Sequence, residues 1–122
     1  MSHAPRLHWT FNRAAALRLV DDDEALLEEV LALFITNGPS WLSAVERAIA
    51  VGDSAALCDS AHALKGAAVY LAVPHFIDAA QELETLGRDG HVHTARARWP
   101  IFAAMAEDVL GALRLALTGT CR

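Results

Sequence analysis

Apolar residues recur every three or four positions along most of the chain, the spacing of helices with one buried face. In the first half, the pattern predicts a short helix over residues 13–20, with Asn12 as its N-cap. Asp21 to Glu24 is predicted to form a capping box for a second helix, with Asp21 accepting from backbone N–H groups and Glu24 reaching back. The sequence Asn37-Gly38-Pro39 is predicted to end that helix, and Pro39 to begin another that ends at Gly52.

Three more helices are predicted in the second half. Asp53 caps the first of them, and its buried seam advances in steps of four and three: Leu57, Ala61, Leu64, Ala68 and Leu71. Pro74 begins the next helix, and Gly87 and Gly90 mark its end. The last helix runs from near Thr94 to about Thr118, and Pro100 in its second turn requires either a later start or a kink.

Helices of this kind, joined by short loops, predict an all-α fold. We expect an antiparallel four-helix-bundle core with one or two additional short N-terminal helices. No repeat or low-complexity linker divides the chain. Residues 1–122 are therefore predicted to form a single domain, with tails at residues 1–11 and 119–122.

Composition excludes several classes of partner. Ten Lys and Arg against fifteen Asp and Glu give a net charge of −5 over 122 residues, which argues against nucleic acid and anionic membranes. Although 54% of the residues are hydrophobic, the longest uncharged stretch, Val30 to Val45, contains Asn-Gly-Pro-Ser and cannot cross a bilayer as one helix. Membrane insertion is therefore not expected. Cys58 and Cys121 could form at most one bridge, so we expect a reducing, cytoplasmic location.

The third of the longer helices carries the candidate chemistry. With Leu57 as the centre of its buried face and about 100° per residue, His62 falls about 140° away, towards water. The outward face around His62 is small and apolar for an exposed surface, which is typical of a docking site. It is predicted to bind a partner through Ala55, Cys58, Asp59 and Val69.

Gly66 and Lys65 lie close to His62 on this helix. A glycine inside a helix costs about 1 kcal/mol relative to alanine, and its missing side chain one turn after His62 leaves room for another protein to approach the ring. Lys65, the single lysine of the chain, lies three residues after His62, near enough to place its ammonium beside a group attached to the imidazole. An exposed imidazole is largely neutral near pH 7, and the neutral ring is nucleophilic.

The pentapeptide His62-Ala63-Leu64-Lys65-Gly66 resembles the His-x-x-Lys-Gly signature of histidine-containing phosphotransfer (HPt) domains, and the helical layout from Phe11 to Leu117 is similar to that family. The resemblance implies a phosphorelay protein: His62 accepts a phosphoryl group, Lys65 supports its charge and Gly66 provides clearance. It also implies response-regulator receiver domains and a hybrid sensor histidine kinase as partners. Mg²⁺ is then expected in the receiver, and no cofactor in this chain.

The resemblance leaves some positions open. Members often have glycine at the position of Ala72 and a small hydroxyl residue at that of Ala67. A polar side chain of the next helix, either Gln81 or Glu84, is expected near the imidazole. Asp59, three residues before His62, either repels a phosphoryl group or orients the protonated ring.

The sequence leaves functions other than phosphotransfer open. The same face could belong to a helical adaptor that docks a signalling partner without carrying phosphate. Cys58 with His62 could form half of a metal site, and His75, His91 and His93 could bind zinc, although no cysteine or carboxylate stands at zinc-site spacing. The sequence contains no nucleotide-binding glycine loop, so autonomous kinase activity is not expected and the chain is predicted to be a phosphocarrier.

Overall fold

Five helices account for the regular structure of the part of the chain described by a computed structural model, residues 11–119. They are α1 (Arg13–Leu19), α2 (Glu24–Val51), α3 (Ser54–Ala68), α4 (Pro74–Arg88) and α5 (Val92–Gly119). The all-α prediction is confirmed. Two predicted N-caps are also confirmed, because Asn12 and Asp53 accept hydrogen bonds from the amides of Ala15 and Ala56. Pro74 begins α4, as predicted.

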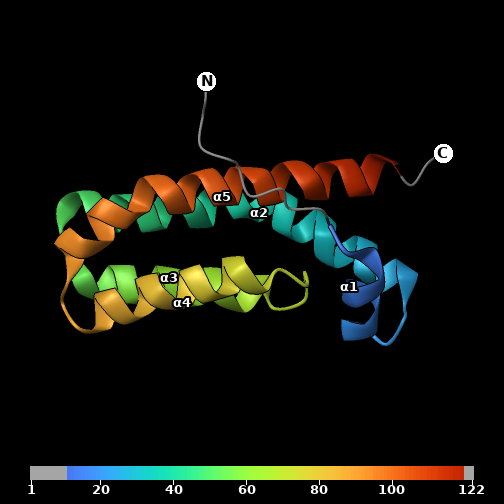
Figure 1. Ribbon diagram of the computed structural model, residues 1–122, viewed down its shortest axis with the longest axis horizontal. Coiled ribbons are helices and arrows are strands. Elements are labelled where there is room, and N and C mark those ends of the chain that lie inside the picture. The colour runs from blue at the N-terminus through green and yellow to red at the C-terminus, as the bar shows by residue number, and fades with distance from the viewer. Residues whose placement is uncertain (1–10, 120–122) are drawn as a thin grey trace, which may run out of the picture.

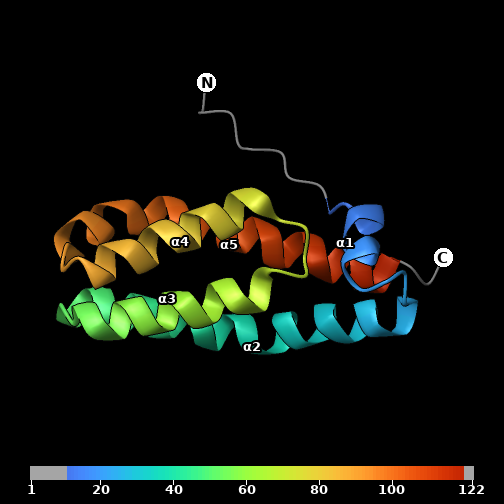
Figure 2. The ribbon, with the colours of Figure 1, turned by 90° about the horizontal axis from the view of Figure 1, so that it is seen from below.

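The four long helices form an antiparallel bundle. Figure 1 shows α2 and α5 in one layer above α3 and α4, and Figure 2 shows the same four helices from below. The connections between α2, α3, α4 and α5 are short, so consecutive helices run in opposite directions. The one additional helix, α1, packs at the end of the bundle where α2 begins.

The core lies between the four helices and contains the residues that the apolar pattern selected. All five predicted seam residues of the His62 helix are fully buried. Three phenylalanine rings connect the other helices: Phe76 of α4 lies 6.2 Å from Phe34 of α2 and 5.1 Å from Phe102 of α5, measured between ring centroids. Packed rings of this kind stabilise the bundle and hold α4 in place behind α3.

The predicted break at Asn37-Gly38-Pro39 is wrong, because α2 continues through it as one helix of 28 residues. Gly38 is buried against α5, and a Cβ at this position would lie 3.3 Å from Cδ2 of Leu110. The glycine therefore allows close helix packing and does not end the helix. Pro39 lies on the exposed side, where water can hydrate the backbone carbonyl that loses its amide partner.

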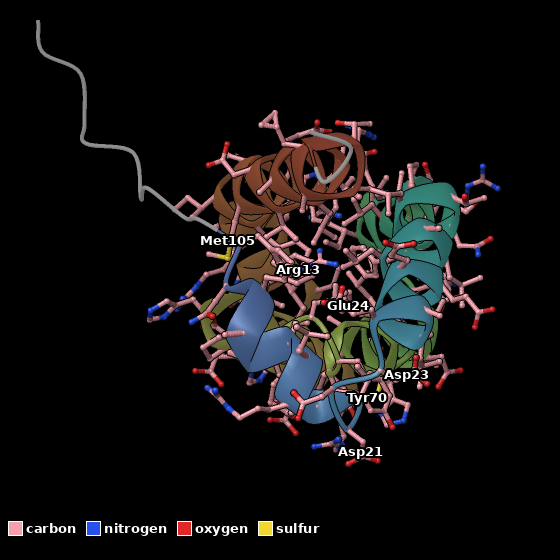
Figure 3. The ribbon with its side chains drawn as sticks, turned by 90° about the vertical axis from the view of Figure 1, so that its right-hand side faces the viewer. Arg13, Asp21, Asp23, Glu24, Tyr70 and Met105 are labelled. Carbon is pink, nitrogen blue, oxygen red and sulfur yellow. The ribbon has the colours of Figure 1, made fainter. Side chains whose placement is uncertain are left out.

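The capping box predicted at Asp21 is also wrong. The N-cap of α2 is Asp23, whose side chain accepts a hydrogen bond from the amide of Leu26. Asp21 adopts the left-handed conformation at φ 56°, and Glu24 pairs with Arg13 of α1. Figure 3 looks onto this end of the bundle, where Arg13 and Glu24 approach each other. The acidic run therefore makes a tight turn before α2 and connects α1 to it.

The last helix begins two residues earlier than predicted, at Val92, and continues through Pro100, so the proline does not delay its start. Most of each predicted tail, including His3, His8 and Cys121, lies outside the described residues. Within residues 11–119, no helix combines the length and the hydropathy that spanning a bilayer requires.

Candidate functional site

His62 lies on the outer face of α3, as its position relative to the seam predicts. Leu57, Ala61 and Leu64 are fully buried, which fixes the rotation of the helix about its axis. His62 therefore points away from the core, and 67% of its side chain is exposed. The spacing of a few apolar residues is thus sufficient to place His62 on the solvent-exposed face of the helix.

Helix α4 lies unusually close to the N-terminal half of α3 because Gly87 has no side chain. A Cβ at Gly87 would lie 2.5 Å from the backbone nitrogen of Cys58 and 2.9 Å from the carbonyl oxygen of Ser54. No real Cβ tolerates the first of these distances, so only glycine allows the two backbones to approach this far. The contact brings the residues one turn earlier on α4, including Glu84, up to His62.

Glu84 is the buried charged residue at the centre of the site. Its side chain is only 7% exposed, and three cationic or ionisable groups surround its carboxylate. Oε2 lies 3.1 Å from Nδ1 of His62 and accepts a hydrogen bond of 3.1 Å from Arg88, while Oε1 lies 2.8 Å from Nζ of Lys65. The carboxylate therefore connects α3 to α4 and supports the imidazole from behind.

The surroundings favour the ionised form of this carboxylate. The hydrogen bond from Lys65 lowers the pKa of Glu84 below its ordinary value, the hydrogen bond and charge of His62 lower it further, and burial opposes the shift. An ionised carboxylate has no proton to give, so Nδ1 of His62 must carry the hydrogen between them. In a neutral imidazole, Nε2 then carries the free lone pair.

Lys65 is held by α4. Its ammonium donates to Oε1 of Gln81 at 2.7 Å besides pairing with Glu84, and only 22% of its side chain is exposed. Gln81 in turn donates to the hydroxyl of Thr85 at 3.1 Å. The question left open between Gln81 and Glu84 is therefore answered: Glu84 contacts the ring of His62, and Gln81 contacts Lys65.

The rest of the predicted docking surface lies on the exposed side of α3. A Cβ at Gly66 would meet no neighbouring atom within 4 Å, so the surface beside His62 is open. Ala55, Asp59 and Val69 are exposed and Cys58, a free cysteine, is partly so. Tyr70, which sequence reasoning missed, adds an exposed aromatic ring just after α3.

Glu84 and Arg88 are the site residues that the sequence signalled most weakly. The apolar stripe of α4 includes Phe76, Ala80 and Leu83, and Glu84 falls on the same buried face. A carboxylate at a buried position needs partners, and that requirement was the available signal. Arg88, one helical turn later, is the neighbour that this spacing provides.

The metal alternatives receive no support from the described residues. His75, His91 and His93 are exposed, and within residues 11–119 no three histidine, cysteine or carboxylate side chains gather where they could hold an ion. Cys58 and His62 share a face of α3, and the described part of the chain brings no third ligand to them.

Comparison with known proteins agrees with the geometry. The family model of the Hpt domain matches residues 29–119, which is most of the chain and includes α3, α4, α5 and most of α2. The chain belongs to the Hpt domain family. This Hpt domain also has the fold of a solved structure, histidine-containing phosphotransfer protein B (HptB) from Pseudomonas aeruginosa PAO1, with a TM-score of 0.70 and 21% identity over 90% of this chain and 92% of the other. Among curated proteins, none matches the sequence.

Proposed function

We propose that this Hpt domain carries a phosphoryl group on Nε2 of His62 between receiver domains of a two-component phosphorelay. The observation that supports this most directly is the placement of His62: its Nδ1 faces a buried carboxylate, and 67% of its side chain is exposed on an open helix face. Membership of the Hpt domain family supports the same role. An imidazole fixed in this way is oriented before the partner arrives, which reduces the entropy lost on reaching the reactive geometry.

The transfer needs no proton to be removed from the ring. The lone pair of Nε2 attacks phosphorus, the N–P bond forms, and the P–O bond of the receiver's aspartyl phosphate breaks with its electron pair returning to the aspartate. The ring becomes positive while Nδ1 keeps its hydrogen. Glu84, already ionised and 3.1 Å from Nδ1, offsets that charge. Transfer to the next receiver reverses these steps and returns a neutral ring.

The receiver domain supplies the remaining chemistry in this proposal. It holds the aspartate and Mg²⁺, and this chain needs no cofactor of its own. A hybrid sensor histidine kinase is the expected source of phosphate, and this domain acts as a phosphocarrier in the cytoplasm without its own kinase activity. The open surface at Gly66 and the exposed side chains of Val69 and Tyr70 provide the docking face.

The deciding experiment incubates the protein with ³²P-labelled receiver domains and Mg²⁺. We expect acid-labile, alkali-stable label on the wild type and none on His62→Gln. His75→Gln is the matched control, because His75 is also an exposed histidine on the adjacent helix and should leave labelling unchanged. Binding of receivers without label on the wild type would instead identify the domain as a non-phosphorylated adaptor.

A further inference from the structure

The cations beside His62 differ in how firmly they are held. Lys65 pairs with Glu84 at 2.8 Å and donates to Gln81 at 2.7 Å, and its side chain is mostly buried. Arg88 makes one contact of 3.1 Å to Glu84, and 56% of its side chain is exposed. Two short contacts in a partly desolvated place leave the ammonium of Lys65 only one of its three N–H donors for a group on Nε2 of His62. Arg88 would give up one contact at the surface.

Arg88 is also placed next to the imidazole. Its NH2 atom and Nδ1 of His62 contact the same carboxylate oxygen, Oε2 of Glu84, so the guanidinium and the ring are close neighbours. The close approach of α3 and α4 at Gly87 fixes the base of the Arg88 side chain beside the turn that precedes His62. A guanidinium has five N–H donors in a planar fork that matches phosphate oxygens, and the contact with Glu84 leaves most of them for another partner.

The charges around His62 also indicate that a phosphoryl group on the ring needs a further cation. Two negative groups lie near the ring: Glu84 behind it, and Asp59, exposed on α3 three residues before it. Lys65 offsets Glu84, with which it is paired. A phosphoryl group on His62 adds further negative charge. Of the two basic side chains that pair with Glu84, Lys65 and Arg88, Arg88 is the one left to offset it.

We propose that Arg88 supplies the N–H donors that contact the phosphoryl group on His62, while Lys65 stays bound to Glu84 and keeps that carboxylate in position. Arg88 is then a catalytic residue and Lys65 a positioning residue. This inference rests on phosphorylation of His62, the proposed function. It assigns the role of charge support, which the sequence resemblance implied for Lys65, to a residue of the neighbouring helix.

The direct test is protection of Arg88 from chemical modification. The full-length protein is phosphorylated with phosphoramidate, a small donor that needs no receiver, and treated with phenylglyoxal in mildly alkaline buffer. Peptide mass spectrometry then gives the modification rate of each arginine. We expect phosphorylation to slow modification of Arg88 and to leave Arg98 unchanged, since Arg98 is a similarly exposed arginine (53%) that pairs with an α4 glutamate away from His62. His62→Gln, treated identically, should show no protection.

Kinetics provide the second readout. Loss of a charge-assisted contact to the phosphoryl group should slow transfer from a phosphorylated receiver between about tenfold and a hundredfold in Arg88→Gln. Arg98→Gln should transfer at the wild-type rate, and Arg88→Lys, which keeps the charge without the planar fork, should lie between them. Circular dichroism of each variant checks that the bundle is intact.

The outcomes separate the two proposals. Absence of label from both phosphoramidate and receivers would overturn the proposed function itself. Label on His62 together with unprotected Arg88 and a wild-type rate for Arg88→Gln would overturn only the assignment of Arg88. Protection of Lys65 from an amine-specific reagent in the phosphorylated protein, without protection of Arg88, would return the role to Lys65.

Discussion

Nδ1 of the exposed His62 lies 3.1 Å from Oε2 of the buried Glu84, on the neighbouring helix. The imidazole is exposed to solvent, where a partner can reach it, whereas the carboxylate is buried in the bundle. Because the surroundings of Glu84 favour its ionised form, Nδ1 of His62 carries the hydrogen and donates it to the carboxylate. The lone pair of Nε2 is then available to the partner. Stability and reactivity at the site therefore depend on the same carboxylate.

Replacing Glu84 with Gln should make the stability of the bundle less dependent on pH. The pKa of Glu84 is lowered in the folded protein, so its ionised form contributes stability above its ordinary pKa of 4.5, and that contribution is lost as the pH falls through the lower, folded value. At pH 7 we expect Glu84→Gln to be less stable by about 1–2 kcal/mol, because Lys65 loses its ionic partner.

Urea unfolding between pH 7 and pH 3 measures this effect. The difference between wild type and Glu84→Gln should shrink as the pH falls below 4.5. Glu82→Gln is the matched control, since Glu82 lies on the same helix and pairs with Arg98 at the surface, and its effect should be a few tenths of a kcal/mol. If the difference in the free energy of unfolding between wild type and Glu84→Gln stayed constant with pH, ionisation of this carboxylate would not support the fold.

Replacing Gly66 with Ala should stabilise the protein and impair its docking. A Cβ at Gly66 meets nothing within the chain, so alanine should raise the free energy of unfolding by up to about 1 kcal/mol through its higher helix propensity. The methyl group would stand one turn from His62, where a receiver must approach, and should slow transfer.

Gly111→Ala is the control for this prediction. Gly111 is also an exposed glycine within a helix, and a Cβ there also meets no atom within 4 Å, but it lies on α5. Both variants should unfold at higher urea concentration, while only Gly66→Ala should transfer slowly. Equal transfer rates for the two variants would remove clearance as the reason for glycine at position 66.

Replacing Ala72 with Gly should stabilise the loop between α3 and α4. Ala72 has φ 57°, a left-handed conformation that costs a residue with a Cβ about 1–2 kcal/mol. Glycine removes that strain but loses more entropy on folding, so the expected net gain is about 0.5–1 kcal/mol. The midpoint of thermal unfolding measures it. Ala104→Gly, at an exposed position within α5, should shift the midpoint the opposite way, and a decrease for both variants would contradict the strain at Ala72.

The sequence was sufficient to predict the bundle, the rotation of α3 and the exposure of His62, because these follow from the spacing of apolar residues. It was insufficient at glycines. Gly38 was interpreted as part of a helix end, yet it is buried within α2, where α5 packs closely against it. Gly87 lies in the last turn of α4, as the sequence predicted, but its close contact with α3 was not predicted. The sequence shows that a side chain is missing but not which neighbour occupies the space. For the same reason, the sequence does not identify contacts between helices, such as that of Glu84 with His62.

Gly87 connects these observations, and replacing it with Ala should disturb both the fold and the site. A Cβ 2.5 Å from the backbone nitrogen of Cys58 meets a rigid helix, so α4 has to move away from α3. Overpacking of this kind typically costs about 1–3 kcal/mol, in contrast to the gain expected for Gly111→Ala.

Movement of α4 should also carry Glu84 away from His62. In ¹⁵N NMR spectra, the wild-type imidazole should show its hydrogen on Nδ1, whereas Gly87→Ala should shift towards the mixture of forms seen for a free, exposed histidine. If the variant were destabilised but kept the wild-type ring signals, the close helix contact would serve packing alone. If both properties changed together, the missing side chain at Gly87 would be the feature that brings the carboxylate within reach of the imidazole.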